Sequence, residues 1–478
     1  MKTIIATFAG LLAFLTSVSA MASGGEEHGH EEHALQVFVF VIALLFAARL
    51  GGRLANRIKQ PAVLGELLAG VAVGALGLLQ GSFGNFVATT KSDPILHWVA
   101  MVGVILLLFK SGLEENIHEM KEVGGRATLV AVVGVVLPVA GGIAFTYFLL
   151  PGHSMLVYVF FGATLAATSV GITAAVFDNF KFKSTETRIV LGAAVVDDII
   201  GLVILGVLSA VAQGGEVSGS FIAIAVVKAV GFLGISILLG RLLAPSISKG
   251  FSRLHSGPEM KMALALVFCG IYAYGAKVLA GLEPIVGAFA AGLVLDAVHF
   301  EKFEEPEIAK KLKVWAGLVE GKRVQKELEL EAEHAREGHV EDLIEGMTKF
   351  FVPIFFIVTG MAVDLRVFKD PQVLLMAGGL TIVAFVGKYA CGFAAGKGTN
   401  KSLVGFGMVP RGEVGLIFAN LGKSYGVLDE KSFAIAVVVV IATTFVAPPL
   451  IAKAIRKSQN DELPETKRQG AKAAAVAE

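Results

Sequence analysis

Two adjacent aspartates, Asp197 and Asp198, interrupt residues 189–208, a run that is otherwise apolar and long enough to cross a lipid bilayer. One carboxylate at the centre of a membrane-spanning helix costs roughly 2.5 to 3.5 kcal/mol on insertion scales. Two in succession indicate that the chain uses negative charge inside the membrane. An intramembrane pathway for ions or protons is therefore the first hypothesis.

The composition supports a membrane protein. Of the 478 residues, 55% are hydrophobic and only 17% are charged, and the mean hydropathy is +0.73. A soluble enzyme of this length carries more charge, so we predict an all-α polytopic membrane protein. A formal net charge of +1 without a basic stripe argues against a nucleic-acid partner. Cys269 and Cys391 lie in apolar segments and suggest no metal site, and no nucleotide or haem motif indicates a cofactor.

The N-terminus has two distinct segments. Residues 1–20 combine Lys2, an apolar stretch and small residues up to Ala20, which is the layout of a cleavable secretory signal peptide. A short uncleaved helix is the alternative. Residues 21–34 form a stub rich in His and Glu, which we expect to be a solvated leader outside the cytoplasm, with weak zinc or copper binding as the other possibility.

Hydrophobic segments define the membrane domain, residues 35–455. At about 20 residues per span they predict about 13 transmembrane helices, near 35–56, 61–80, 95–113, 127–150, 155–177, 187–212, 219–247, 260–280, 284–302, 349–365, 372–396, 402–422 and 431–454. Lys and Arg concentrate in the loops that this count places inside. We therefore expect a multi-pass protein of a bacterial inner membrane, with its N-terminus external and its C-terminus cytoplasmic.

The second half of the chain echoes the first. Residues 61–70 resemble 284–292, and residues 106–114 resemble 354–362. Matching segments are seven predicted helices apart, and an odd offset inverts the second copy in the membrane. We therefore predict two inverted repeats, the arrangement by which secondary transporters build a midplane site. Chance similarity between Gly- and Leu-rich helices is the alternative.

Two polar segments stand outside this pattern. Residues 303–345 are charged with mixed signs, and we expect a cytoplasmic amphipathic insertion of one or two surface helices, either a connector or a regulatory element. Residues 456–478 are short and polar, which predicts a disordered cytoplasmic tail.

Lys388 is a second deep charge. It lies about eight residues from the cytoplasmic end of its predicted helix, and Asp197 and Asp198 lie near the membrane midplane. Opposite charges about 4 Å apart attract by roughly 4 kcal/mol at an effective dielectric of 20. We infer that Lys388 pairs with one aspartate while the other serves a separate purpose, because neighbouring side chains on a helix point about 100° apart. Snorkelling of Lys388 to the interface is the alternative.

Two predicted helices carry signals for a break. Pro410 removes a backbone donor and Gly412 weakens the helix, so we expect an interruption near Arg411 and Glu413. Thr168, Ser169 and Gly171 give a softer signal at the corresponding place in the first repeat. Interrupted helices would offer carbonyl and hydroxyl oxygens to a cation; hydroxyls bonded within their own helix are the alternative. We interpret Arg411 and Glu413 as mainly structural, neutralising one another or the helix ends.

These motifs together resemble a known family. Six ordered segments are similar to the monovalent cation:proton antiporter-2 family, over roughly residues 35–455: residues 61–70, 167–172, 196–198, 353–356, 387–388 and 410–415.

The resemblance implies a fold and roles for individual residues. It implies a core domain with two crossed broken helices, a dimerisation domain and alternating access, and hence a homodimer. It suggests Asp198 as the essential carboxylate that binds cation or proton, Asp197 as the partner of Lys388, and Thr168 and Ser169 beside the site. The double aspartate with a lysine looks like the electrogenic sodium/proton branch.

Some features depart from relatives within that family. The glutathione-gated potassium efflux branch usually carries a different residue before the essential aspartate and a nucleotide-binding C-terminal domain, and neither is present here. Lys110 stands where a small residue is more usual, which leaves the local role of that helix end in doubt.

The functional hypothesis is a secondary antiporter rather than an enzyme. It would exchange Na⁺ for protons, with both ions competing for Asp198 and two protons exchanged for each sodium. The nearest alternative is potassium/proton exchange on the same scaffold, because ligand types alone do not fix ion size. Lithium is a further possible substrate. A gated cation channel, a metal sensor that uses the histidine-rich stub, and an intramembrane aspartyl enzyme are less favoured alternatives.

Overall fold

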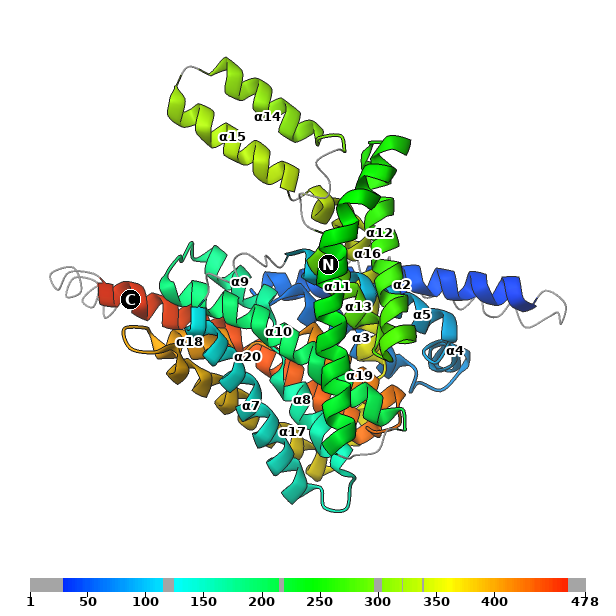
Figure 1. Cartoon of the computed structure of the whole chain (residues 1–478). Coiled ribbons are helices and arrows are strands. Elements are labelled where there is room, and N and C mark those ends of the chain that lie inside the picture. Colours follow the sequence, from blue (N-terminus) through cyan, green and yellow to red (C-terminus); the bar gives the residue numbers. More distant parts are fainter. Residues whose placement is uncertain are drawn as a thin grey trace. The chain divides into compact units, whose positions relative to one another are not determined.

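The computed structural model describes residues 29–114, 124–214, 219–295, 303–319, 321–337 and 339–462. Within these ranges every regular element is a helix (Figure 1), which confirms the predicted all-α class. The predicted signal peptide, residues 1–20, lies outside the described residues.

The membrane spans follow the hydrophobic segments closely. Ten described helices are long and apolar enough to cross a membrane. Each of the three remaining predicted spans corresponds to something shorter: α3 (Ala62–Leu76), α13 (Pro284–Val294), and the interrupted pair of α18 (Lys401–Gly407) and α19 (Glu413–Ser424). Each of the about 13 predicted segments thus has a helical counterpart among the described residues, and α3 and α13 are shorter than predicted because hydropathy does not register where a helix ends inside an apolar run.

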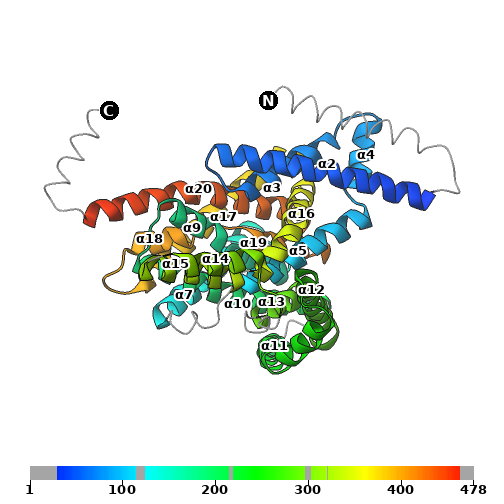
Figure 2. The same cartoon turned by 90° about the horizontal axis from the view of Figure 1, so that it is seen from above.

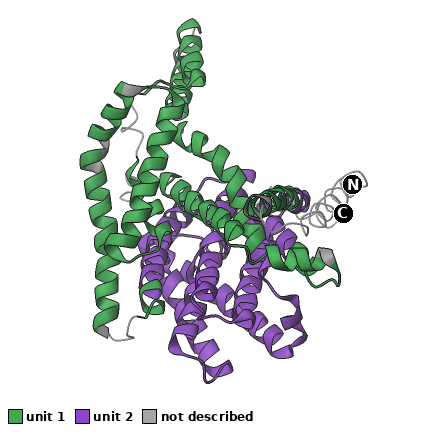
Figure 3. Ribbon diagram, turned by 90° about the vertical axis from the view of Figure 1, so that its right-hand side faces the viewer, with its two compact units in different colours: residues 1–49, 72–117, 209–358 green, residues 50–71, 118–208, 359–478 purple. Residues whose placement is uncertain are grey.

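The chain folds into two compact units, each assembled from three separate stretches (Figure 3). Unit 1 comprises residues 1–49, 72–117 and 209–358, and unit 2 comprises 50–71, 118–208 and 359–478. The following helices belong wholly or mainly to unit 1: α2 (Gly29–Arg57), α4 (Ser82–Thr90), α5 (Pro94–Glu114), α11 (Gly219–Leu254), α12 (Pro258–Gly275), α13, α14 (Glu307–Leu318), α15 (Lys322–Glu337) and α16 (His339–Met361). The following belong wholly or mainly to unit 2: α3, α7 (Gly124–Leu149), α8 (Met155–Ala166), α9 (Val170–Asn179), α10 (Thr185–Ala212), α17 (Pro371–Ala390), α18, α19 and α20 (Glu430–Glu462).

Three short helical segments complete the list: the π-helix η2 (Ala276–Ala280) and the 3₁₀ helices η4 (Leu365–Lys369) and η5 (Cys391–Ala395).

Short polar residues set where several helices begin. Asp93, Asp370 and Asn400 each accept a hydrogen bond from a backbone N–H of the first turn that follows, at 2.8, 3.0 and 3.1 Å. These caps satisfy donors that the helix itself cannot. Pro371 follows the Asp370 cap, at a position where the missing N–H costs nothing.

Glycines bring two helices of unit 1 into backbone contact. A side chain at Gly112 on α5 would collide with the carbonyl oxygen of Phe289 and lie 3.1 Å from the Cα of Gly292 on α13. Gly292 in turn faces the carbonyl of Phe109. The absence of side chains on both helices therefore permits this close packing.

The charged insertion forms two helices, as predicted. α14 and α15 pack against each other and run side by side (Figure 1), and they overlap when seen from above (Figure 2). Their buried residues are small, namely Ala309, Ala316 and Ala332. Where the insertion begins, Glu304 donates its backbone N–H to the carbonyl of Ser256 at 2.8 Å, which ties it to the junction of α11 and α12.

Two helices extend beyond the boundaries predicted for the polar segments at the ends of the chain. α2 starts at Gly29, so residues 29–34 of the predicted solvated stub are helical. α20 continues to Glu462, so residues 456–462 of the predicted disordered tail are helical as well. In both places the polar residues extend a long apolar helix, because propagation adds a hydrogen bond for each residue fixed.

Candidate functional site

Helix α10 carries the two aspartates near its middle. It runs for 28 residues as one uninterrupted α-helix, and both Asp197 and Asp198 are buried. Consecutive positions differ by about 100° around the helix axis, so the two carboxylates face different surroundings. The helix therefore presents two acidic groups at one depth in two directions.

Lys388 reaches Asp197. Its Nζ lies 2.8 Å from Oδ1 and 3.0 Å from Oδ2, and both side chains have 0% exposure. The inferred pairing of Lys388 with one aspartate is thus present in the structure, and the snorkelling alternative is wrong. A buried pair of this kind is held together because neither charge could be left alone in such surroundings.

The backbone of α7 makes room for that lysine. A side chain on Gly134 would lie 3.6 Å from Lys388 Cδ, and one on Gly387 would lie 3.0 Å from the backbone nitrogen of Pro138. These glycines let α7 and α17 approach closely around the ion pair.

The first predicted break is real. α8 ends at Ala166, residues 167–169 are extended, and α9 begins at Val170. Thr168 and Ser169 therefore stand in an interruption between two half-helices, and both are buried.

The second predicted break is also present. α18 ends at Gly407 and α19 starts at Glu413. Pro410 cannot donate a backbone hydrogen bond and disfavours the helical conformation of the residue before it. Gly412 lies at φ −155° and ψ −133°, and a side chain there would lie 2.7 Å from Ser169 Oγ. The glycine is required because the first break packs directly against the second.

Hydrogen bonds cross-link the two breaks. The N–H of Ser169 donates to the carbonyl of Pro410 at 2.8 Å, and Thr168 Oγ1 donates to that of Met408 at 3.3 Å. Thr173 Oγ1 donates to the carbonyl of Gly407 at 2.7 Å. The carbonyls freed by the second break are thus satisfied by donors from the first.

Arg411 joins α8 and α17 to this crossing. It is fully buried, and its guanidinium donates to the carbonyls of Ala167 at 3.2 Å and Ala384 at 3.1 Å. Its own carbonyl accepts a hydrogen bond from Thr444 on α20. Ala167 caps the C-terminal end of α8, where a cation is favourable because that end carries partial negative charge, and Ala384 lies inside α17. Arg411 therefore acts on one helix terminus, in line with one of its two predicted roles.

Glu413 is the first residue of α19, and its Oε2 accepts a hydrogen bond from Ser169 Oγ at 3.3 Å. A carboxylate in the first turn of a helix complements the positive end of the helix dipole. Glu413 therefore also acts on a helix terminus.

The aspartates lie opposite this crossing. Val190 on α10 is next to Gly407, where an added side chain would approach within 2.9 Å, and Gly201 faces Val414. These contacts flank Asp197 and Asp198 along α10, and all of the helices involved belong to unit 2. The structure therefore brings together Asp197, Asp198, Lys388, Thr168, Ser169, Pro410, Arg411 and Glu413 in one unit.

Two residues of this arrangement were missed from the sequence. Thr173 and Thr444 were not singled out, because a lone hydroxyl in an apolar helix usually bonds to the carbonyl one turn earlier. Only Thr173's position one turn after a predicted break could have indicated it. No sequence signal marked Thr444.

The arrangement gathers oxygen atoms of the kinds that small cations prefer. Within the described residues no group of three or more His, Cys, Asp or Glu is placed to hold a metal ion. A cation at this site would therefore take oxygen ligands of mixed type, from a carboxylate, hydroxyls and backbone carbonyls. The hydroxyl of Thr168 donates a hydrogen bond to the carbonyl of Met408. The lone pairs of the hydroxyl oxygen therefore stay available to such an ion.

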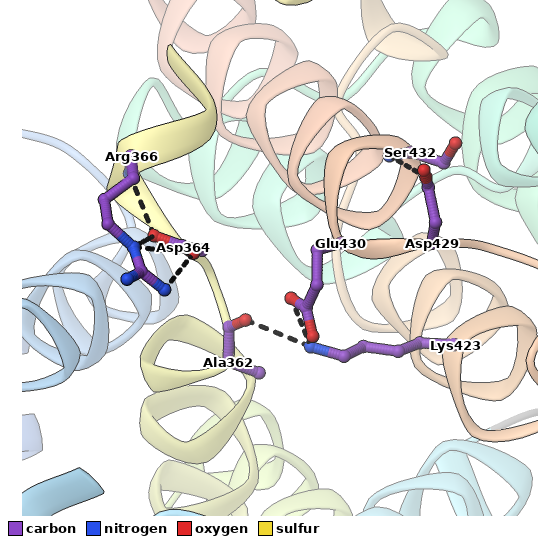
Figure 4. Close-up of polar contacts among 7 residues, drawn as sticks. All are labelled: Ala362, Asp364, Arg366, Lys423, Asp429, Glu430 and Ser432. Atoms are coloured by element: carbon purple, nitrogen blue, oxygen red, sulfur yellow. Dashed lines mark hydrogen bonds and ion pairs between the residues drawn. The ribbon is translucent and has the colours of Figure 1, made fainter. Parts of the chain in front are cut away.

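The other end of α19 is tied to the chain that follows α16 (Figure 4). Lys423 donates to the carbonyl of Ala362 at 3.2 Å and to Glu430 at 2.9 Å. Arg366 binds Asp364 through two nitrogens, at 3.0 and 2.8 Å. Both contacts fix the loop that leads into α17, the helix that carries Lys388.

Asp370, which caps α17, belongs to the same loop. The hydrogen bond from Lys431, 2.7 Å away, lowers the pKa of this carboxyl below its ordinary value. The pair is therefore ionised at neutral pH, and its contribution to stability is lost only as the pH falls through that lowered value.

Comparison with known proteins decides the family. Residues 40–457 match the model of a family described as "Sodium/hydrogen exchanger, transmembrane". The chain belongs to this sodium/hydrogen exchanger family. It is an integral membrane protein, and the expected relationship to cation:proton antiporters is confirmed.

Individual relatives cover nearly the whole chain. The chain is 35% identical over 465 residues to the high-affinity Na(+)/H(+) antiporter NhaS3 of Synechocystis sp., an alignment that covers 90% of this chain and 92% of the relative. It is 32% identical to the Na(+)/H(+)-K(+) antiporter GerN of Bacillus cereus, over 87% of this chain and 95% of the relative.

Solved structures show the same fold. The structure of the sodium proton antiporter MjNhaP1 from Methanocaldococcus jannaschii superposes with a TM-score of 0.63, at 14% identity, and covers 89% of this chain and 99% of its own. The predicted fold class of this family member is thereby confirmed.

Proposed function

We propose that this protein is a secondary antiporter that exchanges Na⁺ for protons, with both ions competing for Asp198. The observation that carries the proposal is the set of buried charges at the crossing of two broken helices. Asp197 is already paired with Lys388, and Asp198 lies beside it on a different side of α10. Relatives over most of the chain are named Na(+)/H(+) antiporters, which supports the same activity here.

The competition follows from electrostatics. A carboxylate in the membrane interior is costly when it is ionised and uncompensated, so it favours a bound proton or a bound cation. It cannot hold both, because protonation removes the charge that attracts the cation. Alternating access of the site to the two sides then couples the two fluxes.

Asp197 and Lys388 supply a second titratable pair. Protonation of Asp197 would break its bond with Lys388, and this would allow two protons to exchange for one sodium ion. Such exchange moves one net charge per cycle, which gains about 2.3 kcal/mol per 100 mV of membrane potential. We propose that transport is electrogenic for this reason.

Proton flux in proteoliposomes tests the role of Asp198. We expect Asp198→Asn to abolish Na⁺-dependent proton movement, because an amide cannot exchange a proton for a cation. Glu259→Gln, on exposed surface of unit 1, is the matched control and should transport normally. Exchange at the wild-type rate in Asp198→Asn would contradict the proposal.

Potassium/proton exchange is the second candidate, and it is favoured by the relative named a Na(+)/H(+)-K(+) antiporter. Parallel assays with Na⁺, Li⁺ and K⁺, with and without an imposed voltage, separate the two candidates. A rate that changes with voltage supports electrogenic exchange, and a voltage-independent rate contradicts it.

The cellular setting is also part of the proposal. The signal-like start and the distribution of basic loops support a bacterial inner membrane, with the N-terminus external and the C-terminus cytoplasmic. A homodimer is expected from the family alone. Reactivity of an engineered cysteine in residues 463–478 with an impermeant label would establish the side of the C-terminus.

A further inference from the structure

Helix α14, in the charged insertion, exposes a set of large apolar side chains. Ile308, Trp315 and Leu318 are 61%, 56% and 75% exposed. With 3.6 residues per turn they fall within an arc of about 80° on one side of the helix. Three large exposed apolar side chains on one side of a short helix indicate an interaction surface.

The remaining sides of α14 have other partners. Ala309 and Ala316 are buried on the side that packs with α15. Lys310 and Lys313 lie on a third side, where they pair with Glu304 at 2.5 Å and with Glu305 at 2.7 Å. The apolar strip is therefore separate from the hairpin contact and from these two ion pairs. Lys311, which pairs with Glu307 at 3.6 Å, lies within the arc of the strip, where its apolar stem can lie along the strip while its ammonium reaches water.

The start of α14 is anchored at the end of membrane-spanning helices. Phe303 is buried in the core cluster formed with residues of α12 and α13. Glu304 is bonded to Ser256, two residues before the candidate span that begins at Pro258. The apolar strip thus begins within one helical turn of a residue that packs on the ends of these spans.

Length and charge narrow the choice of partner. Twelve residues make a helix about 18 Å long, too short to cross a bilayer. Residues 303–319 contain three lysines and three glutamates, so the segment carries no net charge that would attract an oppositely charged protein. Tryptophan prefers the boundary between lipid and water, and an amphipathic helix with lysines on its polar side lies in the plane of that boundary.

We propose that α14 lies in the membrane interface, with Ile308, Trp315 and Leu318 inserted among phospholipid headgroups and upper acyl chains. The insertion between α13 and α16 is then a membrane-surface anchor rather than a solvated connector. Because the charges of the segment balance, contact should form on zwitterionic phosphatidylcholine and change little when anionic lipid is added. This inference does not depend on which ions the protein transports.

Tryptophan fluorescence tests the proposal sharply, because the chain has only Trp98 and Trp315. A Trp98→Phe variant in phosphatidylcholine nanodiscs reports on Trp315 alone. We expect quenching by lipids brominated near the carbonyl region to exceed quenching by lipids brominated near the bilayer centre, since interfacial helices insert only about 5–10 Å. Aqueous iodide should quench Trp315 weakly.

A matched control moves the probe to α15. Glu329 is exposed and accepts a hydrogen bond from Gln325 of the same helix. In the variant Trp98→Phe, Trp315→Phe, Glu329→Trp we expect strong iodide quenching and little quenching by bromolipid. Adding Leu318→Glu to the Trp98→Phe background should reduce bromolipid quenching of Trp315.

Two outcomes overturn the proposal. Strong iodide quenching without bromolipid quenching places Trp315 in water, and protection from both quenchers places it against protein. A spin label at Leu318→Cys gives a second measurement that leaves both tryptophans in place, since Cys269 and Cys391 are buried. Its collisions with oxygen should exceed those with a water-soluble nickel complex, and the reverse order contradicts membrane contact.

Discussion

At the scale of single residues, the pair formed by Lys388 and Asp197 dominates the energetics of the site. Removing both groups from water carries a large desolvation cost, which their mutual attraction offsets only while both are present. The pair is therefore better understood as a functional requirement than as a source of stability.

Removal of one partner should be far worse than removal of both. We expect Lys388→Met to lower the free energy of unfolding by about 3–5 kcal/mol, because Asp197 would be left buried with an uncompensated charge. The double variant Asp197→Asn, Lys388→Met should recover most of that loss. Thermal unfolding of the three proteins in detergent measures both effects, and equal stability of the single and double variants would show that the charge on Asp197 is not costly.

Thr173 is the second residue whose role can be measured directly. Thr173→Val keeps the shape of the side chain but leaves the buried carbonyl of Gly407 without its donor. We expect a loss of about 1–3 kcal/mol in unfolding free energy. Thr173→Ser, which retains the hydroxyl, serves as the control and should lose much less. A loss in Thr173→Val no larger than that in Thr173→Ser would contradict a dominant role for this hydrogen bond.

At the scale of helices, breaks and glycine contacts decide the architecture. The interruptions at residues 167–169 and 408–412 leave backbone groups that must find partners elsewhere, and they find them in each other. The contact between Gly412 and Ser169 shows that the two breaks must also approach each other closely to form these hydrogen bonds. The same principle operates in unit 1, where Gly112 and Gly292 join α5 to α13.

Gly112→Ala tests that packing. The new methyl group would meet the carbonyl of Phe289, and overpacking of this kind costs about 1–3 kcal/mol. Gly270→Ala on α12 is the matched control, because nothing lies within 4 Å of a side chain there. We expect it to be neutral or stabilising by about 0.5–1 kcal/mol, since alanine favours helix. Indistinguishable unfolding temperatures for the two variants would mean that α5 and α13 separate freely.

At the scale of the whole molecule, all of the candidate site residues belong to unit 2, and the charged insertion belongs to unit 1. A ligand that binds only the folded site must stabilise the whole chain by mass action. Stability in the presence of cations therefore reports on the site independently of transport.

We expect Na⁺ at 100 times its dissociation constant to raise the free energy of unfolding by about 2.7 kcal/mol. The increase should shrink as the pH falls, because protons displace Na⁺ from the same carboxylate. Asp198→Asn should remove it entirely. Unfolding temperatures over a matrix of Na⁺ concentration and pH provide the measurement, with choline as the control cation; a sodium effect that is the same at every pH would refute competition.

The sequence alone determined the helical class, most of the spanning segments and the identity of the charged residues in the site. These properties are local, because an apolar run of sufficient length has few alternatives in a bilayer, and Pro410 or an intramembrane aspartate is conspicuous by itself. Even the pairing of Lys388 could be inferred, since a deep ammonium requires a nearby anion.

Only the tertiary structure decided which hydrogen-bond donor pairs with which acceptor. The hydrogen bonds of Thr173 to Gly407, of Arg411 to two carbonyls and of Thr444 to Arg411 join residues that are 27 to 244 positions apart. The true ends of α3 and α13 inside apolar runs are equally invisible to hydropathy. The residue type fixes which hydrogen-bond donors and acceptors a position offers, but their pairing depends on where packing brings distant helices together.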